Sequence, residues 1–183
     1  MPKIIAQKKD WINLGHKLFS EQGHTGIVVE KLAKKLKCNK SSFYWHFKTK
    51  KDFIQALIDH WVFIETEQII NLTNLEKSAK EKFDTLIALA YKKMPHQDFI
   101  FFLTRYAQND KKTKAILDKI EKQRIEYVSS LLLEIGYSRQ EAEIKSGIFY
   151  KHLIGYHEMI RYKKQEKDYL YEVKKELNQF IKY

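Results

Sequence analysis

The chain contains few of the residues that break or cross-link a protein. Its 183 residues include 1 Cys, 2 Pro and 6 Gly. A single cysteine, Cys38, excludes an intrachain disulfide and favours a reducing compartment. Because Pro and Gly are rare and apolar residues almost never alternate with polar ones, nearly every segment has the period of a helix. The sequence therefore predicts an all-α fold.

Long hydrophobic runs are also missing. The longest runs extend from Leu86 to Tyr91 and from Phe99 to Leu103, far below the roughly 18 residues that a membrane span requires. Residues Met1 to Ile5 do not form the apolar core of a signal peptide. We therefore expect a cytoplasmic protein with no membrane partner.

Acidic residues are scarce at the N-terminal end alone. Residues 1–51 hold 12 Lys and Arg against 3 Asp and Glu, a net charge of +9. Residues 52–183 hold 22 against 20, a net charge of +2. Since the excess is confined to the first quarter of the chain, it favours a polyanionic partner for that end. We expect this partner to be double-stranded DNA.

Residues 31–51 combine aromatic and basic side chains with the pattern of a helix, a tight break and a second short helix. Asn39 is expected to cap the second helix. At about 100° per residue, Phe43 and Phe47 then share the inner face. Trp45 lies on the opposite, outward face together with two serines, and Tyr44 and His46 flank it. The pattern predicts a recognition helix for a DNA groove.

The first turn of a recognition helix meets base edges, whereas its flanks meet phosphates. Lys40 suits guanine, Ser42 can bond a base, and the Trp45 indole suits a thymine methyl. The alternative is a short amphipathic helix whose aromatics pack against the rest of the domain. The predicted DNA-binding residues are Lys40, Ser41, Ser42, Tyr44, Trp45, His46, Lys48 and Lys50.

The remaining segments predict about nine helices in two domains. Gly15 lies on the packed face of the first helix, where it permits close approach of a neighbour, and Gly23 ends that helix. Thr49 to Asp52 matches a capping box and begins a helix that extends to about Leu72. We expect a linker at 71–77 and further helices near 78–94, 98–107, 113–135, 138–160 and 166–182. The predicted domains are a DNA-binding domain, 1–51, and a helical ligand-binding and dimerisation domain, 52–183.

Enzymatic chemistry has no support in the sequence. It shows no Gly-rich phosphate loop, no HExxH and no convincing Ser/His/Asp set. His152 and His157 diverge around a helix, so we expect neither a metal nor another cofactor.

Arg124 falls near the apolar stripe of its helix, where it is either an anion ligand or a solvated or interface residue. Several aromatic and histidine side chains can line a ligand pocket, although aromatics at helical spacing more often belong to the core. The predicted pocket residues are Tyr91, His96, Phe102, Tyr106, Tyr127, Phe149, His152 and Tyr156.

The N-terminal motif resembles the tetracycline-repressor (TetR) family of bacterial regulators. The family pattern is met by Leu18-Phe19, Gly23, Leu32-Ala33, Tyr44, His46-Phe47 and Lys50. The resemblance implies a homodimer in which each subunit has a three-helix DNA-binding head and a larger ligand-binding body, and in which the last two long helices form a four-helix interface. Two departures are Ile27-Val28, in place of a threonine pair, and Lys37, in place of a helix-ending glycine.

This resemblance implies a transcription regulator, most simply a repressor that a small molecule releases from a palindromic operator. Two heads would enter successive major grooves, and the helix from Thr49 would transmit the effect of the ligand. Two other classes remain open. An architectural protein would coat DNA without sequence preference, and a basic amphipathic protein would bind anionic membranes.

Overall fold

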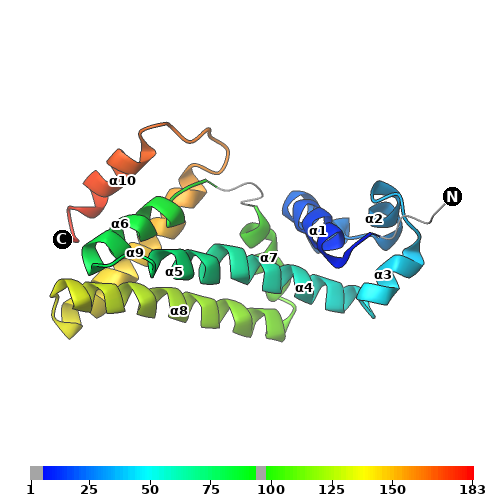
Figure 1. The fold of residues 1–183 in the computed structure, drawn as a ribbon, viewed down its shortest axis with the longest axis horizontal. Helices are drawn as coiled ribbons and strands as arrows, with labels where there is room; N and C mark the ends of the chain where they lie inside the picture. The colour runs from blue at the N-terminus through cyan, green and yellow to red at the C-terminus, as the bar shows by residue number, and fades with distance from the viewer. Residues whose placement is uncertain (1–5, 94–97) are drawn as a thin grey trace. The chain divides into compact units, whose positions relative to one another are not determined.

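The computed structural model describes residues 6–93 and 98–183, and every regular element in these ranges is helical (Figure 1). The all-α prediction is confirmed. Helices α4, η2 and α5 follow one another without a break, so the described residues form nine continuous α-helical segments beside the 3-10 turn η1. The elements are α1 (Lys8–Gln22), η1 (Gly23–Gly26), α2 (Val29–Lys35), α3 (Lys40–His46), α4 (Lys50–Val62), the π-helical turn η2 (Phe63–Glu67), α5 (Gln68–Thr73), α6 (Ala79–Ala90), α7 (Phe99–Ala107), α8 (Lys111–Ile135), α9 (Arg139–Met159) and α10 (Tyr169–Leu177).

The chain forms two compact units. Unit 1 comprises Met1–Phe63 and Pro95–Ala115, and unit 2 comprises Ile64–Met94 and Ile116–Tyr183. The chain passes between them three times, inside η2, between residues 94 and 95, and within α8. The functional boundary expected after residue 51 stays a prediction. Among the described helices, none has the length and apolar character needed to span a bilayer.

In unit 1, α1 is packed between α4 and α7. Trp11 and Phe19 of α1 are fully buried, as are Phe53 and Leu57 of α4. A Cβ placed on Gly15 would lie 2.4 Å from Cζ of Phe53 and 2.9 Å from Cδ2 of Leu57. Glycine is therefore required where α1 crosses α4, which confirms the close approach expected from the sequence.

Substitution of this glycine gives a test of the packing. Gly15→Ala is expected to lower the free energy of unfolding by about 1–3 kcal/mol, because the added methyl overpacks the contact with Phe53. Urea unfolding followed by circular dichroism measures the change. The matched control is Asn13→Ala on the exposed side of the same helix, where no loss is expected. Equal stability of Gly15→Ala and the wild type would contradict the close packing of α1 against α4.

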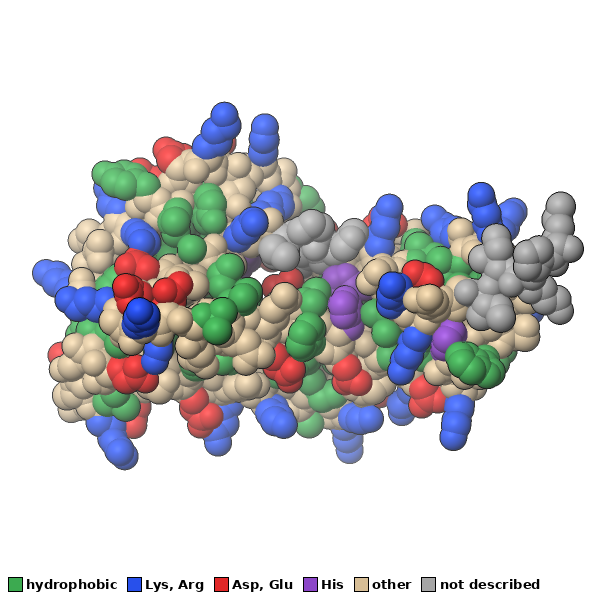
Figure 2. Space-filling model, in the orientation of Figure 1, with side chains coloured by type: hydrophobic (Ala, Val, Ile, Leu, Met, Phe, Trp, Pro, Cys, Tyr) green, Lys and Arg blue, Asp and Glu red, His purple; other side chains and the backbone are tan. Residues whose placement is uncertain are grey.

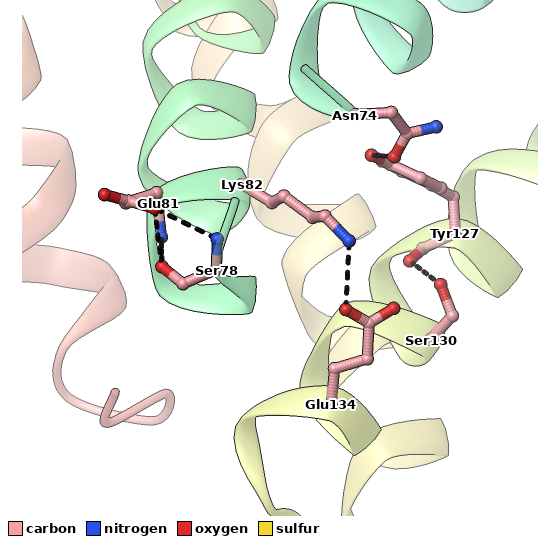
Figure 3. A network of polar contacts seen from close by, with 7 residues as sticks. All are labelled: Asn74, Ser78, Glu81, Lys82, Tyr127, Ser130 and Glu134. Atoms are coloured by element: carbon pink, nitrogen blue, oxygen red, sulfur yellow. Dashed lines mark hydrogen bonds and ion pairs between the residues drawn. The ribbon is translucent and has the colours of Figure 1, made fainter. Parts of the chain in front are cut away.

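Unit 2 has one apolar core, to which α6, α8, α9 and α10 all contribute. The buried members include Phe83 and Ile87 of α6, Leu132 of α8, Phe149 of α9 and Leu177 of α10. Polar contacts tie its elements together at the surface (Figure 3). The Tyr127 hydroxyl donates to Asn74 Oδ1 at 2.8 Å, and Lys82 Nζ lies 3.1 Å from Glu134 Oε2. These contacts join α8 to the turn after α5 and to α6.

Helix ends follow local sequence signals closely. The capping boxes predicted at Thr49 and Ser138 are present, with Asp52 and Glu141 as the reciprocal partners. Gly23 ends α1 with φ = 67°. Several predicted bounds differ from the structure. The helix expected near 78–94 ends at Ala90, and the helix expected near 166–182 begins at Tyr169. The segment expected as a linker from residue 71 is still helical up to residue 73, and the last helix ends at Leu177, after which the chain is held by buried Ile181.

Candidate nucleic-acid interface

A short turn joins α2 to α3 and fixes the direction in which α3 leaves it. Lys37 in this turn has φ = 52°, a left-handed conformation that favours glycine. The Cys38 amide donates to the Ala33 carbonyl at 3.0 Å, which closes the end of α2. Lysine thus occupies the conformation for which the family pattern has glycine. The departure noted in the sequence leaves the turn intact.

Phe43 lies beneath α3 at the centre of an aromatic cluster. Its side chain is fully buried. Its ring centroid lies 5.3 Å from that of Trp11 and 5.2 Å from that of Phe53, both edge-to-face. Phe47, also buried, lies 4.7 Å from Phe53. These rings attach α3 to α1 and α4, so that the helix presents a fixed opposite face.

The opposite face of α3 is aromatic and open to solvent. The exposed fraction of Trp45 is 80%, and that of Tyr44 is 55%. Ser41, Lys48 and Lys50 are exposed as well. Lys50 is the first residue of α4, directly after the Thr49 cap. The Trp45 ring contacts that of His46 edge-to-face, with centroids 4.8 Å apart. Most of the indole surface is nevertheless available to an external partner.

Ser42 and His46 lie on the side of α3 that meets the segment before α1. The His46 Nε2 atom lies 2.9 Å from the Ala6 carbonyl oxygen, and the Ser42 hydroxyl donates to the same oxygen at 3.4 Å. Both side chains are half-buried, and Ala6 is buried. In this structure both residues bond to Ala6, which precedes α1. Their predicted contacts with DNA stay predictions.

Lys40 pairs with Glu30 across the helix-turn-helix. Its Nζ atom lies 2.8 Å from Glu30 Oε1, and both side chains are more than half exposed. The hydrogen bond from Lys40 lowers the pKa of Glu30, and the same bond raises the pKa of Lys40. A phosphate or a guanine must therefore compete with Glu30 for this cation. Sequence reasoning missed Glu30, because no local periodicity connects residues on two different helices.

Removing this carboxylate is expected to strengthen DNA binding. Glu30→Gln should raise the affinity for DNA by about 3- to 10-fold, because Lys40 becomes available and a charge that repels phosphate is lost. Fluorescence anisotropy with labelled duplex at two salt concentrations measures the change. Glu21→Gln, which removes an exposed acid from α1, serves as the control for net charge. An equal gain in both variants would show that the Lys40 contact has no special role.

Cations surround the exposed face of α3. Lys31, Lys34, Lys35 and Lys37 are all exposed on α2 and the turn that follows it. Figure 2 shows Lys and Arg side chains projecting over the α1–α3 region. Lys8 also approaches α3, with its Nζ atom 5.7 Å from the Phe47 ring centroid. Together with the net charge of +9 over residues 1–51, these side chains provide the electrostatic surface that a phosphate backbone requires.

The eight residues proposed for a ligand pocket fall into separate groups. Phe149, His152 and Tyr156 of α9 surround buried Tyr91 in unit 2, and the Tyr91 hydroxyl lies 2.9 Å from His152 Nδ1. Burial raises the pKa of Tyr91. Tyr127 also lies in unit 2 but bonds to Asn74 (Figure 3). The ligand role of all eight stays a prediction.

Two further predicted pocket residues lie in unit 1. Phe102 and Tyr106 belong to α7 in unit 1. A Cβ on Gly23 would lie 2.8 Å from Phe102 Cδ1, and the Tyr106 ring centroid lies 5.2 Å from that of His24. His96 lies outside the described residues. The described members from α7 therefore pack against the end of α1 and η1.

Known proteins match this arrangement in both sequence and fold. Residues 12–57 match the family of bacterial regulatory proteins, tetR family. Over 85 residues the chain is 25% identical to YuxN, an HTH-type transcriptional regulator of Bacillus subtilis (strain 168); the match covers 46% of this chain and 29% of the length of that relative.

Solved structures share the whole fold at low sequence identity. A transcriptional regulator from Aquifex aeolicus VF5 is 22% identical, with TM-score 0.70 and coverage of 94% of this chain and 95% of that chain. A protein from Saccharomonospora viridis in complex with choline is 13% identical, with TM-score 0.76 and coverage of 94% of both chains. The fatty acid degradation regulator FadR from Bacillus halodurans is 18% identical, with TM-score 0.66 and coverage of 93% and 92%.

The buried aromatic cluster, the exposed face of α3 and the lysines of the head are the features of a helix-turn-helix DNA-binding domain. Residues 12–57, about a quarter of the chain, match the TetR family of bacterial regulatory proteins. The resemblance read from the motif is confirmed, and the family consists of transcription regulators rather than enzymes.

Proposed function

We propose that this protein is a homodimeric transcriptional repressor that binds a near-palindromic operator and is released from it by a small molecule. The recognition helix is α3, whose exposed Trp45 reads the major groove beside Lys40, while Tyr44 on its flank meets a phosphate. The observation that carries this proposal is the division of α3 into two faces. Phe43 is fully buried, whereas 80% of Trp45 is exposed.

A second copy of the chain is the expected partner of α9. Ile144, Ile148 and Met159 are exposed by 56%, 41% and 72%. At about 100° per residue they share one side of α9 with Gly155, opposite the buried Phe149 and Leu153. A Cβ on Gly155 would meet no atom within 4 Å. An exposed apolar face with room for a close neighbour supports a helix-to-helix contact between subunits.

Dimerisation sets how the two heads meet DNA. Two copies of α3 can occupy successive major grooves when they lie about 34–36 Å, or somewhat more, apart. A ligand that binds one arrangement of the dimer more tightly than another shifts the fraction that is competent for DNA. The continuous helix of α4, η2 and α5 connects α3 to unit 2 along the chain. It is therefore the expected route of this effect.

An architectural DNA-coating protein is the second candidate function. It would use the lysines of the head without reading bases. The exposed indole and serine of α3 favour sequence recognition, because a coating protein needs only cations.

Selection from fragmented genomic DNA tests the proposal. The full-length protein is incubated with the fragments at physiological salt, and the bound fragments are sequenced. The proposal predicts enrichment of an inverted repeat whose half-sites lie one helical turn, or slightly more, apart. Enrichment of a single half-site would contradict the dimer, and recovery of unselected fragments would favour the coating protein.

A further inference from the structure

Arg124 of α8 places a guanidinium in the interior of unit 2. Its Nε atom donates to Thr66 Oγ1 at 3.0 Å. Its Nη2 atom donates to the same oxygen at 2.7 Å and to the Glu65 carbonyl oxygen at 2.9 Å. Thr66 is buried, and Arg124 itself is only partly buried. These three bonds end on neutral oxygens, and burial lowers the pKa of the Arg124 guanidinium.

The groups around Arg124 determine the charge of this cluster. Burial raises the pKa of the Glu65 carboxyl, an effect that nearby Arg124 partly offsets. Burial also raises the pKa of Tyr150 of α9, which shares a side-chain hydrogen bond with Arg124. Burial lowers the pKa of His157, and the charges of Arg124 and Lys93 lower it further. Arginine remains charged at pH 7, so Arg124 brings a permanent positive charge to the cluster.

The acceptors of Arg124 belong to an unusual part of the backbone. Glu65 and Thr66 lie in the π-helical turn η2, and the chain passes from unit 1 to unit 2 between Phe63 and Ile64 of the same turn. Single π-helical turns inside α-helices are rare and often mark functional positions. Arg124 therefore supports the widened turn by bonding directly to two of its residues.

We infer that Arg124 and Tyr150 bind the carboxylate of a small effector with a single negative charge. The carboxylate replaces Thr66 Oγ1 and the Glu65 carbonyl oxygen as the hydrogen-bond acceptor of the guanidinium. A carboxylate offers the planar pair of oxygens that matches the fork of an arginine. A charge-assisted pair would replace hydrogen bonds to neutral oxygens, and such pairs are roughly twice as strong. A single guanidinium pairs with one carboxylate, which carries a single negative charge.

This inference rests on the ligand-released repressor proposed above, and it names the chemistry of the ligand. Exchange at Arg124 would remove the side-chain support of η2. The helix that contains η2 continues through α4, which follows α3 in the chain. A change in η2 can therefore be transmitted through this helix to the DNA-binding face. The carboxylate is expected to be attached to an apolar body, since Val128 and Phe149, on the same two helices, are buried in the core.

Calorimetric titration of the full-length protein without DNA tests the site. Sodium octanoate and sodium benzoate are compared with octan-1-ol and benzyl alcohol, which have the same apolar bodies without the charge. The inference predicts that at least one carboxylate binds about 10- to 100-fold more tightly than its alcohol. This preference should fall to within about 3-fold in Arg124→Gln and should persist in Arg139→Gln, which removes an exposed arginine of α9.

Two further variants keep the test decisive if Arg124→Gln does not fold. Tyr150→Phe should weaken the carboxylate by several-fold, because one donor is lost. Thr66→Val should tighten it, because a competing acceptor is removed while the charge remains. The inference is overturned if a folded Arg124→Gln keeps the preference, if Thr66→Val weakens the carboxylate, or if no carboxylate binds the wild type below about 10 mM.

Operator binding is measured in parallel with the selected duplex. If octanoate or benzoate releases wild-type protein but not Arg124→Gln from DNA, both the site and the proposed function are supported. If a carboxylate binds in an Arg124-dependent way without changing DNA affinity, the site is supported and the ligand-released part of the proposed function fails. If neither carboxylate binds while the palindrome is still bound, the site is overturned and DNA recognition stands.

Discussion

Trp45→Ala is expected to weaken binding to the selected operator by about 10- to 100-fold, a loss of about 1.5–3 kcal/mol. The indole is 80% exposed on the outward face of α3, where its apolar surface is available to a thymine methyl and to the backbone. Since it packs against little of its own subunit, the midpoint of thermal unfolding should stay within about 1 °C of the wild type. Fluorescence anisotropy and differential scanning calorimetry measure the two quantities.

The matched control for this variant is Leu75→Ala. Leu75 is 77% exposed, and it lies in the turn after α5 rather than on α3. The control should change neither DNA affinity nor stability. If Trp45→Ala binds the operator as tightly as Leu75→Ala does, α3 is not the helix that reads the groove.

Phe43→Ala is expected to lower the free energy of unfolding by about 3–5 kcal/mol. The side chain is fully buried, and its ring contacts those of Trp11, Phe47 and Phe53. Truncation would leave a cavity and remove several edge-to-face ring contacts, each worth about 0.5–1.5 kcal/mol. DNA binding should be lost together with the head, as measured by urea unfolding and by anisotropy at a temperature where the wild type is folded.

Tyr44, the residue after Phe43, distinguishes a side chain that contacts DNA from one that holds α3 in place. Tyr44→Ala alters the next side chain, which is 55% exposed, and it should reduce DNA affinity with a loss of stability below about 1 kcal/mol. A loss below about 1 kcal/mol for Phe43→Ala as well would mean that the aromatic cluster does not hold α3 in place.

Local patterns in the sequence predicted the parts of the fold that depend on neighbours along the chain. The spacing of Phe43, Phe47 and Trp45 identified the two faces of α3, because every residue of a helix turns by about the same angle. Thr49 and Ser138 identified helix starts, because their partners lie three residues later. Gly15 identified the close crossing of helices, since a missing side chain on a packed face has few other purposes.

Contacts between residues distant in the sequence were not predictable in this way. The bonds from Ser42 and His46 to Ala6 join residues 36 and 40 positions apart, and the Lys40–Glu30 pair joins two helices. Helical spacing predicts that a side chain is buried, but not which helix it faces. The pocket predicted from Phe102, Tyr106, Tyr91 and His152 therefore stays a prediction.

The role of Arg124 was likewise not decided by the sequence alone. Its position near the apolar stripe of α8 left an anion site, a solvated residue and an interface residue open. Only the fold brings it to Thr66, 58 positions earlier in the chain. The π-helical turn at η2 also has no signal in a pattern that reads as one continuous helix from residue 49 to residue 72.

Competition between two duplexes tests sequence recognition by α3 most directly. Labelled palindrome from the genomic selection is bound to the protein at physiological salt and displaced with either unlabelled palindrome or a shuffled duplex of the same composition. If the outward face of α3 reads bases, the shuffled duplex should be needed at about 1,000-fold higher concentration or more. Displacement at equal concentrations would show that the lysines of the head bind phosphates alone, and it would contradict base recognition by Trp45 and its neighbours.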